Sequence, residues 1–128
     1  DYFELECKRP YNTDGRQIDG SVTLDGTTFL VELKFTQGPI APKDISDFYR
    51  KVISKADNTM GIFVSISGFN ANARKESSGE RTPLLLLDFK HLYHVLAGAM
   101  TLAEVINRVK RQSAQTAEAY LPVENFGK

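Results

Sequence analysis

The 128-residue chain has one cysteine, no net charge and no long apolar run, and each of these absences removes a class of protein. Cys7 by itself cannot form an internal disulfide, so a disulfide-stabilised fold is excluded, and an unpaired thiol suits a reducing cytoplasm, where we expect the protein to act. Sixteen basic and sixteen acidic side chains cancel. Nucleic-acid binding through overall positive charge is therefore excluded, and any such surface must be local.

Membrane segments and phosphate-binding loops are also missing. No apolar run approaches the about 18 residues of a membrane span, and no secretory leader is recognisable, so we expect no membrane partner. The glycines form no Walker or dinucleotide-binding pattern. The length and the 41% hydrophobic content fit one domain over residues 1–128 with its own core, and the start at Asp1 leads us to expect a fragment of a longer protein.

Residues 18–35 read as two strands joined by Asp25-Gly26, because apolar and polar residues alternate on both arms and this dipeptide favours a type I′ hairpin turn. With a two-residue turn, Asp19 lies opposite Glu32. Lys34, two residues further on, joins them on the same face. A four-residue loop would instead place Asp19 opposite Lys34. In either register the three charged side chains cluster.

Two carboxylates that face each other across a strand pair repel, so the pair needs a cation. Lys34 is one candidate. A divalent metal is a stronger one, because Mg²⁺ takes oxygen ligands and is commonly held by one or two carboxylates with water and phosphate. The alternative interpretation is a salt-bridge cluster on a solvated face of the sheet.

The segments Ile18-Asp19-Gly20 and Glu32-Leu33-Lys34 resemble the Asp…Glu-x-Lys signature of PD-(D/E)XK nucleases, and in particular of Mrr-like bacterial restriction and defence nucleases. The similarity extends over about residues 16–69. It implies an α/β, restriction-endonuclease-like fold in which helices flank a central mixed sheet of four or five strands. It also implies a Mg²⁺-dependent endonuclease that hydrolyses DNA in restriction or anti-phage defence, with Mn²⁺ as a substitute metal.

The resemblance further implies roles for single residues. Asp19 and Glu32 would hold the metal together with the backbone carbonyl of Leu33, and Lys34 would orient the attacking water or stabilise developing charge.

Members of the resembled family often use a further acid from a first helix, for which Glu6 and Glu4 are the candidates here. Residues 2–11 leave that element open: Phe3, Leu5 and Cys7 alternate as in a strand, yet the segment also fits the end of a helix.

A helix is predicted over residues 43–56, where apolar side chains recur with helical spacing. These are Ile45, Phe48, Tyr49, Val52 and Ile53. Lys51 and Lys55 are one turn apart on this helix and so are neighbours on its surface. We assign them as contacts to a DNA phosphate; the alternative is that both are merely solvated.

The rest of the chain is predicted to contain two buried strands and two helices. Asp88 is expected to cap the first helix, which ends at Gly98, and Thr101 to open the second with a capping box. His91 and His94 have a spacing seen in zinc sites but lack an obvious third ligand. The predicted ranges are a turn at 12–15, strands at 61–69 and 84–88, a polar loop at 70–83, and a last helix from 101 to about 120, before Pro122.

Two other functions remain open. A non-catalytic member of the same fold would serve as a nucleic-acid-binding or dimerisation module, and an unrelated α/β interaction domain would use the cluster as a salt bridge. Expected partners are DNA and, through domains absent from this sequence, a homodimer or a larger defence assembly.

Overall fold

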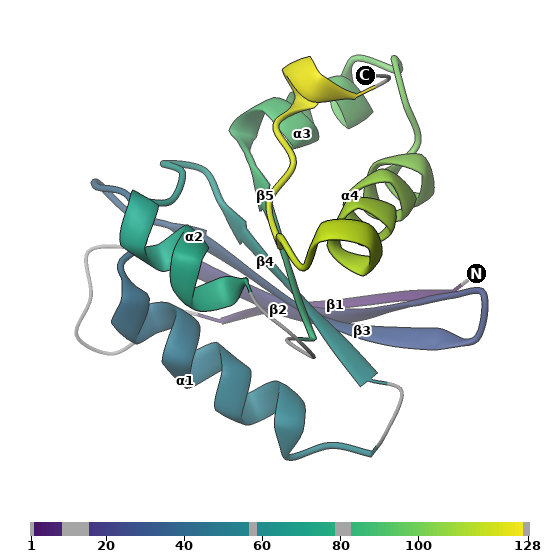
Figure 1. Cartoon of the computed structure of the whole chain (residues 1–128). Coiled ribbons are helices and arrows are strands. Elements are labelled where there is room, and N and C mark those ends of the chain that lie inside the picture. The colour runs from purple at the N-terminus through teal and green to yellow at the C-terminus, as the bar shows by residue number, and fades with distance from the viewer. Residues whose placement is uncertain (1, 9–15, 57–58, 79–82, 127–128) are drawn as a thin grey trace.

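The computed structural model describes residues 2–8, 16–56, 59–78 and 83–126, with side chains from Asp19 onward. Five strands form one mixed sheet in the order β1-β2-β3-β4-β5, with helices on both faces (Figure 1). The first three strands are antiparallel, and β3, β4 and β5 are parallel. The predicted mixed sheet is confirmed. The elements are β1 (Tyr2–Lys8), β2 (Arg16–Leu24), β3 (Thr27–Phe35), α1 (Pro42–Ile53), β4 (Thr59–Ser65), α2 (Ala71–Ser77), β5 (Leu84–Asp88), α3 (Phe89–Leu96), α4 (Leu102–Thr116) and a 3₁₀ turn (Val123–Asn125).

The hairpin of β2 and β3 has the predicted two-residue turn. Asp25 and Gly26 have φ angles of 50° and 82°, the left-handed conformation that a type I′ turn requires at both central positions. The register places Leu24 opposite Thr27 and Asp19 opposite Glu32. The four-residue alternative, in which Asp19 would face Lys34, is therefore wrong.

The sheet separates two apolar cores. On one face α1 and α2 pack against the even-numbered residues of β5 and against Phe63 of β4. On the other face α4 and α3 cover β2, β3 and the alternate residues of β4 and β5. Figure 1 shows these two helix pairs on opposite sides of the strands. The carboxylates of the hairpin belong to the α1 face.

Helix α1 lies unusually close to the sheet at Gly61. A Cβ atom built there would lie 2.5 Å from Val52 Cγ2 and 2.7 Å from Phe48 Cε2. Only glycine therefore lets the helix seat its apolar stripe directly on β4, and the same approach brings the rest of α1 within reach of β3.

Several predicted element boundaries are wrong. Helix α1 ends at Ile53 and not at residue 56, and strand β4 begins at Thr59 and not at residue 61. The polar segment after β4 contains helix α2, whose Asn70 cap accepts a hydrogen bond from the Ala73 N–H group at 2.7 Å. Only Ala73 and Ser77 of this helix are buried, too few to produce a periodic pattern. Strand β4 ends at Ser65 rather than at residue 69, because the chain turns at Gly68, where φ is 86°.

The last helix is also shorter than predicted. It ends at Thr116 because Ala117 adopts the left-handed conformation (φ 62°). The chain then runs alongside β5, where the Leu86 N–H group donates to the Ala119 carbonyl at 2.9 Å. Pairing with the sheet, not Pro122, therefore ends the helix.

The predicted caps of α3 and α4 are confirmed, and the first organises a buried polar cluster. Asp88 caps α3 and accepts hydrogen bonds from the Tyr120 hydroxyl and the Lys90 and His91 N–H groups. Buried His91 places Nε2 2.8 Å from the Leu121 carbonyl. Although burial by itself would raise the pKa of Asp88, its hydrogen bonds with His91 and Tyr120 hold that pKa well below its ordinary value.

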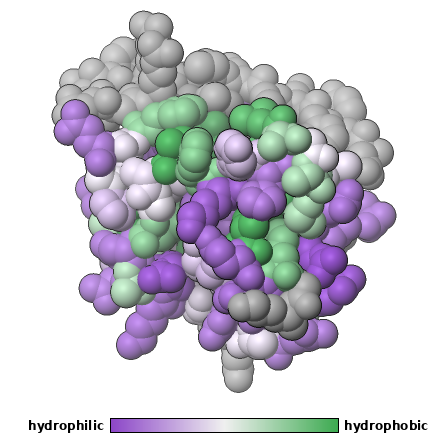
Figure 2. All heavy atoms as spheres, turned by 90° about the horizontal axis from the view of Figure 1, so that it is seen from above, coloured by the Kyte–Doolittle hydropathy of each residue, from purple (hydrophilic) through white to green (hydrophobic). Residues whose placement is uncertain are grey.

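The surface beyond this cluster is mixed. Figure 2 shows hydrophilic and hydrophobic side chains interleaved on the face seen from above. Helix α3 exposes the large apolar side chains of Phe89, Tyr93 and Leu96. In the part of the chain that is described, no helix has the length and apolar character needed to cross a membrane. The turn predicted at 12–15 lies outside the described residues.

The close approach at Gly61 gives a stability prediction. Gly61→Ala forces Val52 and Phe48 apart, and overpacking of this kind costs about 1–3 kcal/mol of unfolding free energy. Gly38→Ala is the matched control, because nothing lies within 4 Å of its Cβ position. Urea unfolding of both variants checks this. Equal stability of the two would mean that α1 is not held as closely as described.

Candidate active site

Asp19 and Glu32 occupy facing positions on β2 and β3, the two strands of the hairpin. Glu32 is 4% exposed, beneath α1. On the other side of β2, strand β1 adds two further acids: the backbone register places Glu6 opposite Asp19 and Glu4 opposite Ser21. The opening segment is therefore a strand, and the further acid, if Glu6 supplies it, would come from a strand and not from a helix. The side chains of Glu4 and Glu6 lie outside the described residues.

Lys34 lies between two acids from different elements. Its Nζ atom is 3.8 Å from Glu32 Oε2 and 3.3 Å from Asp44 Oδ1 in the first turn of α1. The ammonium also lies 5.8 Å from the centre of the Phe63 ring. The three-residue cluster predicted from the hairpin therefore has a fourth member, Asp44, which sequence reasoning missed because only the packing of α1 brings it to the sheet.

Lys51, on α1, also contacts the Glu32 carboxylate. Its Nζ atom donates to Glu32 Oε1 at 2.8 Å, although 54% of its side chain is exposed. Partial burial would lower the pKa of Lys51, but the hydrogen bond to Glu32 and the negative charges of Glu32, Asp19 and Asp47 raise it above its ordinary value. Glu32 thus lies between two ammonium groups.

The contact of Lys51 with Glu32 was not predicted, yet the sequence carried a weak signal for it. Lys51 follows Phe48 by three residues and precedes Val52, so it borders the buried stripe of α1. A long lysine side chain at such a border can run along the apolar surface and place its charge at the sheet. Lys55, one turn further on, is exposed and forms no ion pair with any residue that the structure describes.

The oxygen ligands that the described residues offer suit a hard cation that keeps most of its bound water. No group of three His, Cys, Asp or Glu side chains gathers among the described residues. Asp19 and Glu32 therefore offer two carboxylates, the number by which Mg²⁺ is commonly held alongside water and phosphate. Leu33 lies opposite Ile18 in the sheet, and a carbonyl oxygen with two lone pairs can accept one hydrogen bond and still bind an ion.

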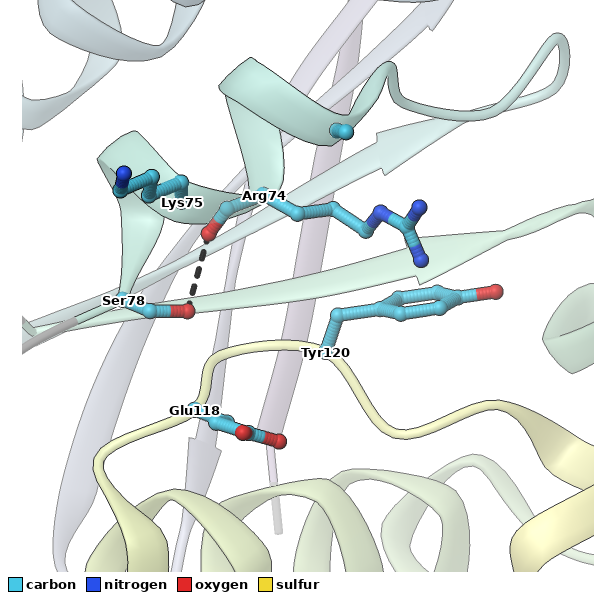
Figure 3. Close-up of a pocket in the computed structure, with 6 residues that line it drawn as sticks. Arg74, Lys75, Ser78, Glu118 and Tyr120 are labelled. Carbon is cyan, nitrogen blue, oxygen red and sulfur yellow. Dashed lines mark hydrogen bonds between the residues drawn. The ribbon is translucent and has the colours of Figure 1, made fainter.

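A second polar hollow of about 350 Å³ lies between α2 and the C-terminal segment. Figure 3 shows Arg74 stretched over the Tyr120 ring, 5.4 Å from its centre, with Lys75 and Ser78 beside it. Ser78 Oγ donates to the Arg74 carbonyl and accepts from the Ala119 N–H group. Glu118 also lines this hollow. Its cations therefore already have a carboxylate and an aromatic ring close by.

The pairing of Lys51 with Glu32 predicts a stability effect. Lys51→Met keeps the apolar stem but removes the charge from a buried carboxylate, which should cost about 1 kcal/mol, a small value because the lysine end is open to solvent. Lys55→Met is the matched control and should change the unfolding free energy by less than about 0.5 kcal/mol. Chemical unfolding at neutral pH measures both. The contact is irrelevant to stability if the two variants match the wild type.

Comparison with known proteins identifies the family of the chain. The family model Mrr_cat, described as a restriction endonuclease, matches residues 3–96, more than two thirds of the chain. One similar solved structure is the MspJI restriction endonuclease in complex with a 27-mer oligonucleotide, at 14% sequence identity and a TM-score of 0.38. The alignment covers 95% of this chain but 30% of that one. No curated protein matches the sequence. On the extent of the family match, the chain belongs to the restriction endonuclease family, as the hairpin signature predicted.

Proposed function

We propose that this domain is a metal-dependent endonuclease that hydrolyses phosphodiester bonds of DNA. The observation that carries the proposal is the register of the hairpin, which sets Asp19 directly opposite Glu32 with Lys34 on the same face. A rigid sheet holds these groups in place better than a loop would. The membership of the restriction endonuclease family supports the same reaction.

In this mechanism Asp19 and Glu32 would hold one Mg²⁺ ion, or Mn²⁺ in its place, and the Leu33 carbonyl would be a further ligand. When bound, the ion supplies charge neutralisation at the phosphate and lowers the pKa of a bound water. Lys34 directs its ammonium toward the attacking water and the developing negative charge. Asp44 holds the Lys34 side chain in position, because the two side chains are hydrogen-bonded at 3.3 Å.

Lys51 and Lys55 are proposed to contact the DNA backbone from α1. The Lys51 ammonium also neutralises Glu32 in the metal-free protein, which removes part of the repulsion between the facing carboxylates. We further propose that the domain belongs to a longer cytoplasmic protein of restriction or anti-phage defence, working as a homodimer or within a larger assembly.

A second candidate function rests on the same contact. Because Lys34 and Lys51 both lie at Glu32, the carboxylate is balanced without a metal. A catalytically silent module that binds nucleic acid or dimerises would keep such an arrangement. Metal binding and cleavage therefore have to be measured separately.

Cleavage is tested on supercoiled plasmid with Mg²⁺ or Mn²⁺ and with EDTA as the blank. Asp19→Asn, Glu32→Gln and Lys34→Gln should each reduce the cleavage rate by at least about 100-fold. Asp25→Asn is the matched control, since the same change at the exposed hairpin turn leaves the cluster intact and asparagine tolerates its positive φ.

The outcomes separate the two candidate functions. Wild-type protein that binds Mn²⁺ through Asp19 yet never cuts DNA would support the silent module. Loss of cleavage in Asp25→Asn as well would point to general damage of the hairpin.

The DNA contacts of α1 predict a change in salt dependence. Each phosphate contact contributes about −0.9 to the slope of log affinity against log salt concentration. Lys55→Ala should flatten the slope by about one unit, and the Lys51→Ala/Lys55→Ala pair by up to about two. Fluorescence anisotropy with a short duplex and Ca²⁺ measures this, with Lys75→Ala/Lys90→Ala as the control. An unchanged slope in the α1 variants would show that both lysines are only solvated.

A further inference from the structure

Helix α4 carries a polar stripe beside its buried one. Arg108, Arg111, Gln112 and Gln115 are spaced i, i+3, i+4 and i+7 and so share one side of the helix. The buried side chains Val105, Ile106 and Val109 face the sheet instead. The stripe combines two guanidinium groups with two carboxamides. The nearest acid on this side of the helix is Glu104, one turn before Arg108, and its carboxylate accepts a hydrogen bond from the Thr101 hydroxyl at 3.1 Å.

The stripe forms one wall of a pocket of about 450 Å³. The opposite wall comes from the C-terminal segment, with the Asn125 carboxamide and the half-buried Phe126 ring. This volume lies in the range of small-molecule sites, which are commonly partly apolar with a few converging polar groups. Three carboxamides and two guanidinium groups therefore converge beside an aromatic ring.

No carboxylate lines this pocket. In the part of the chain that the structure describes, neither Arg108 nor Arg111 has a hydrogen-bonding or ion-pairing partner for its guanidinium group. Two like charges three residues apart on a helix repel each other. The hollow between α2 and the C-terminal segment differs in this respect, because Glu118 lines it together with Arg74 and Lys75. The lining of the α4 pocket thus carries positive charge without a lining acid, and an anion would balance it.

Guanidinium groups bind phosphate oxygens in pairs of parallel hydrogen bonds. Carboxamides present a donor and an acceptor side by side, the arrangement that recognises a nucleobase edge. Phe126 offers a flat apolar surface beside them. The chemistry of the pocket therefore matches a phosphate attached to a base better than it matches either part alone.

The pocket is separate from the candidate active site. Helix α4 packs on the face of the sheet opposite to α1, whereas Asp19, Glu32 and Lys34 belong to the α1 side. All the lining residues lie between 108 and 126, beyond the 3–96 range that the restriction endonuclease model matches. A ligand there would not compete with DNA for the hairpin carboxylates.

We propose that this pocket binds a free mononucleotide, with the phosphate on Arg108 and Arg111 and the base among Gln112, Gln115, Asn125 and Phe126. The site is independent of the nuclease proposal, because it requires neither the carboxylate pair nor a metal.

The test is calorimetric titration of the 128-residue chain with the four ribonucleoside 5′-monophosphates and, separately, with inorganic phosphate and with a 12-base-pair duplex. At least one nucleotide should bind ten times more tightly than phosphate. The double variant Arg108→Gln/Arg111→Gln should bind that nucleotide at least tenfold more weakly. Its melting temperature should be unchanged, because both arginine side chains are exposed. Arg50→Gln, an exposed arginine on α1, is the control and should bind as the wild type does.

Three results would overturn the proposal. The first is that no nucleotide binds at millimolar concentration. The second is that the double variant binds as tightly as the wild type. The third is that phosphate or the duplex binds the pocket at least as well as any nucleotide, which would make it a simple anion site or a contact to DNA. Repeating the titration with Asp19→Asn keeps the result distinct from nuclease activity, because that variant should bind the nucleotide unchanged.

Discussion

A buried carboxylate held between two ammonium groups is the constraint on which the candidate active site depends. Glu32 cannot lie under α1 as an isolated charge, since burial of an unpaired ion is costly, and Lys34 and Lys51 supply the compensation. That contact in turn requires α1 to lie close to the sheet, which the bare backbone of Gly61 permits. Sheet, helix and charge cluster are therefore one arrangement and cannot be altered separately.

The zero net charge of the protein hides an uneven distribution of charged side chains. Opposite charges are not spread evenly: acids and bases balance at the hairpin, while the α4 pocket holds arginines without a lining acid. Overall charge therefore says little about which anions the domain binds. Anion binding depends instead on the local electric field of a few side chains that the sheet and α4 bring together.

The sequence was most informative where structure is local. The Asp25-Gly26 turn indicated the hairpin and limited it to two registers, and the structure has the one in which Asp19 faces Glu32. The caps at Asp88 and Thr101 were readable for the same reason. Helix α2 was not predicted because it buries only two side chains. The end of α4 was predicted too late because it depends on a tertiary contact, the pairing of the following segment with β5. The approach of Lys51 to Glu32 also depends on packing. The roles of Glu4 and Glu6 remain predictions.

The hairpin origin of the acid pair also bears on the order of folding. Asp19 and Glu32 are close in sequence and joined by a tight turn, and hairpins of this kind form within microseconds, whereas a parallel β3–β4 pairing must first close a longer loop. We therefore expect the two carboxylates to meet before α1 brings Lys51 to them. During that interval their repulsion works against the hairpin, and docking of α1 relieves it. We expect docking of α1 to stabilise the β2–β3 hairpin, because it places the Lys51 ammonium beside Glu32.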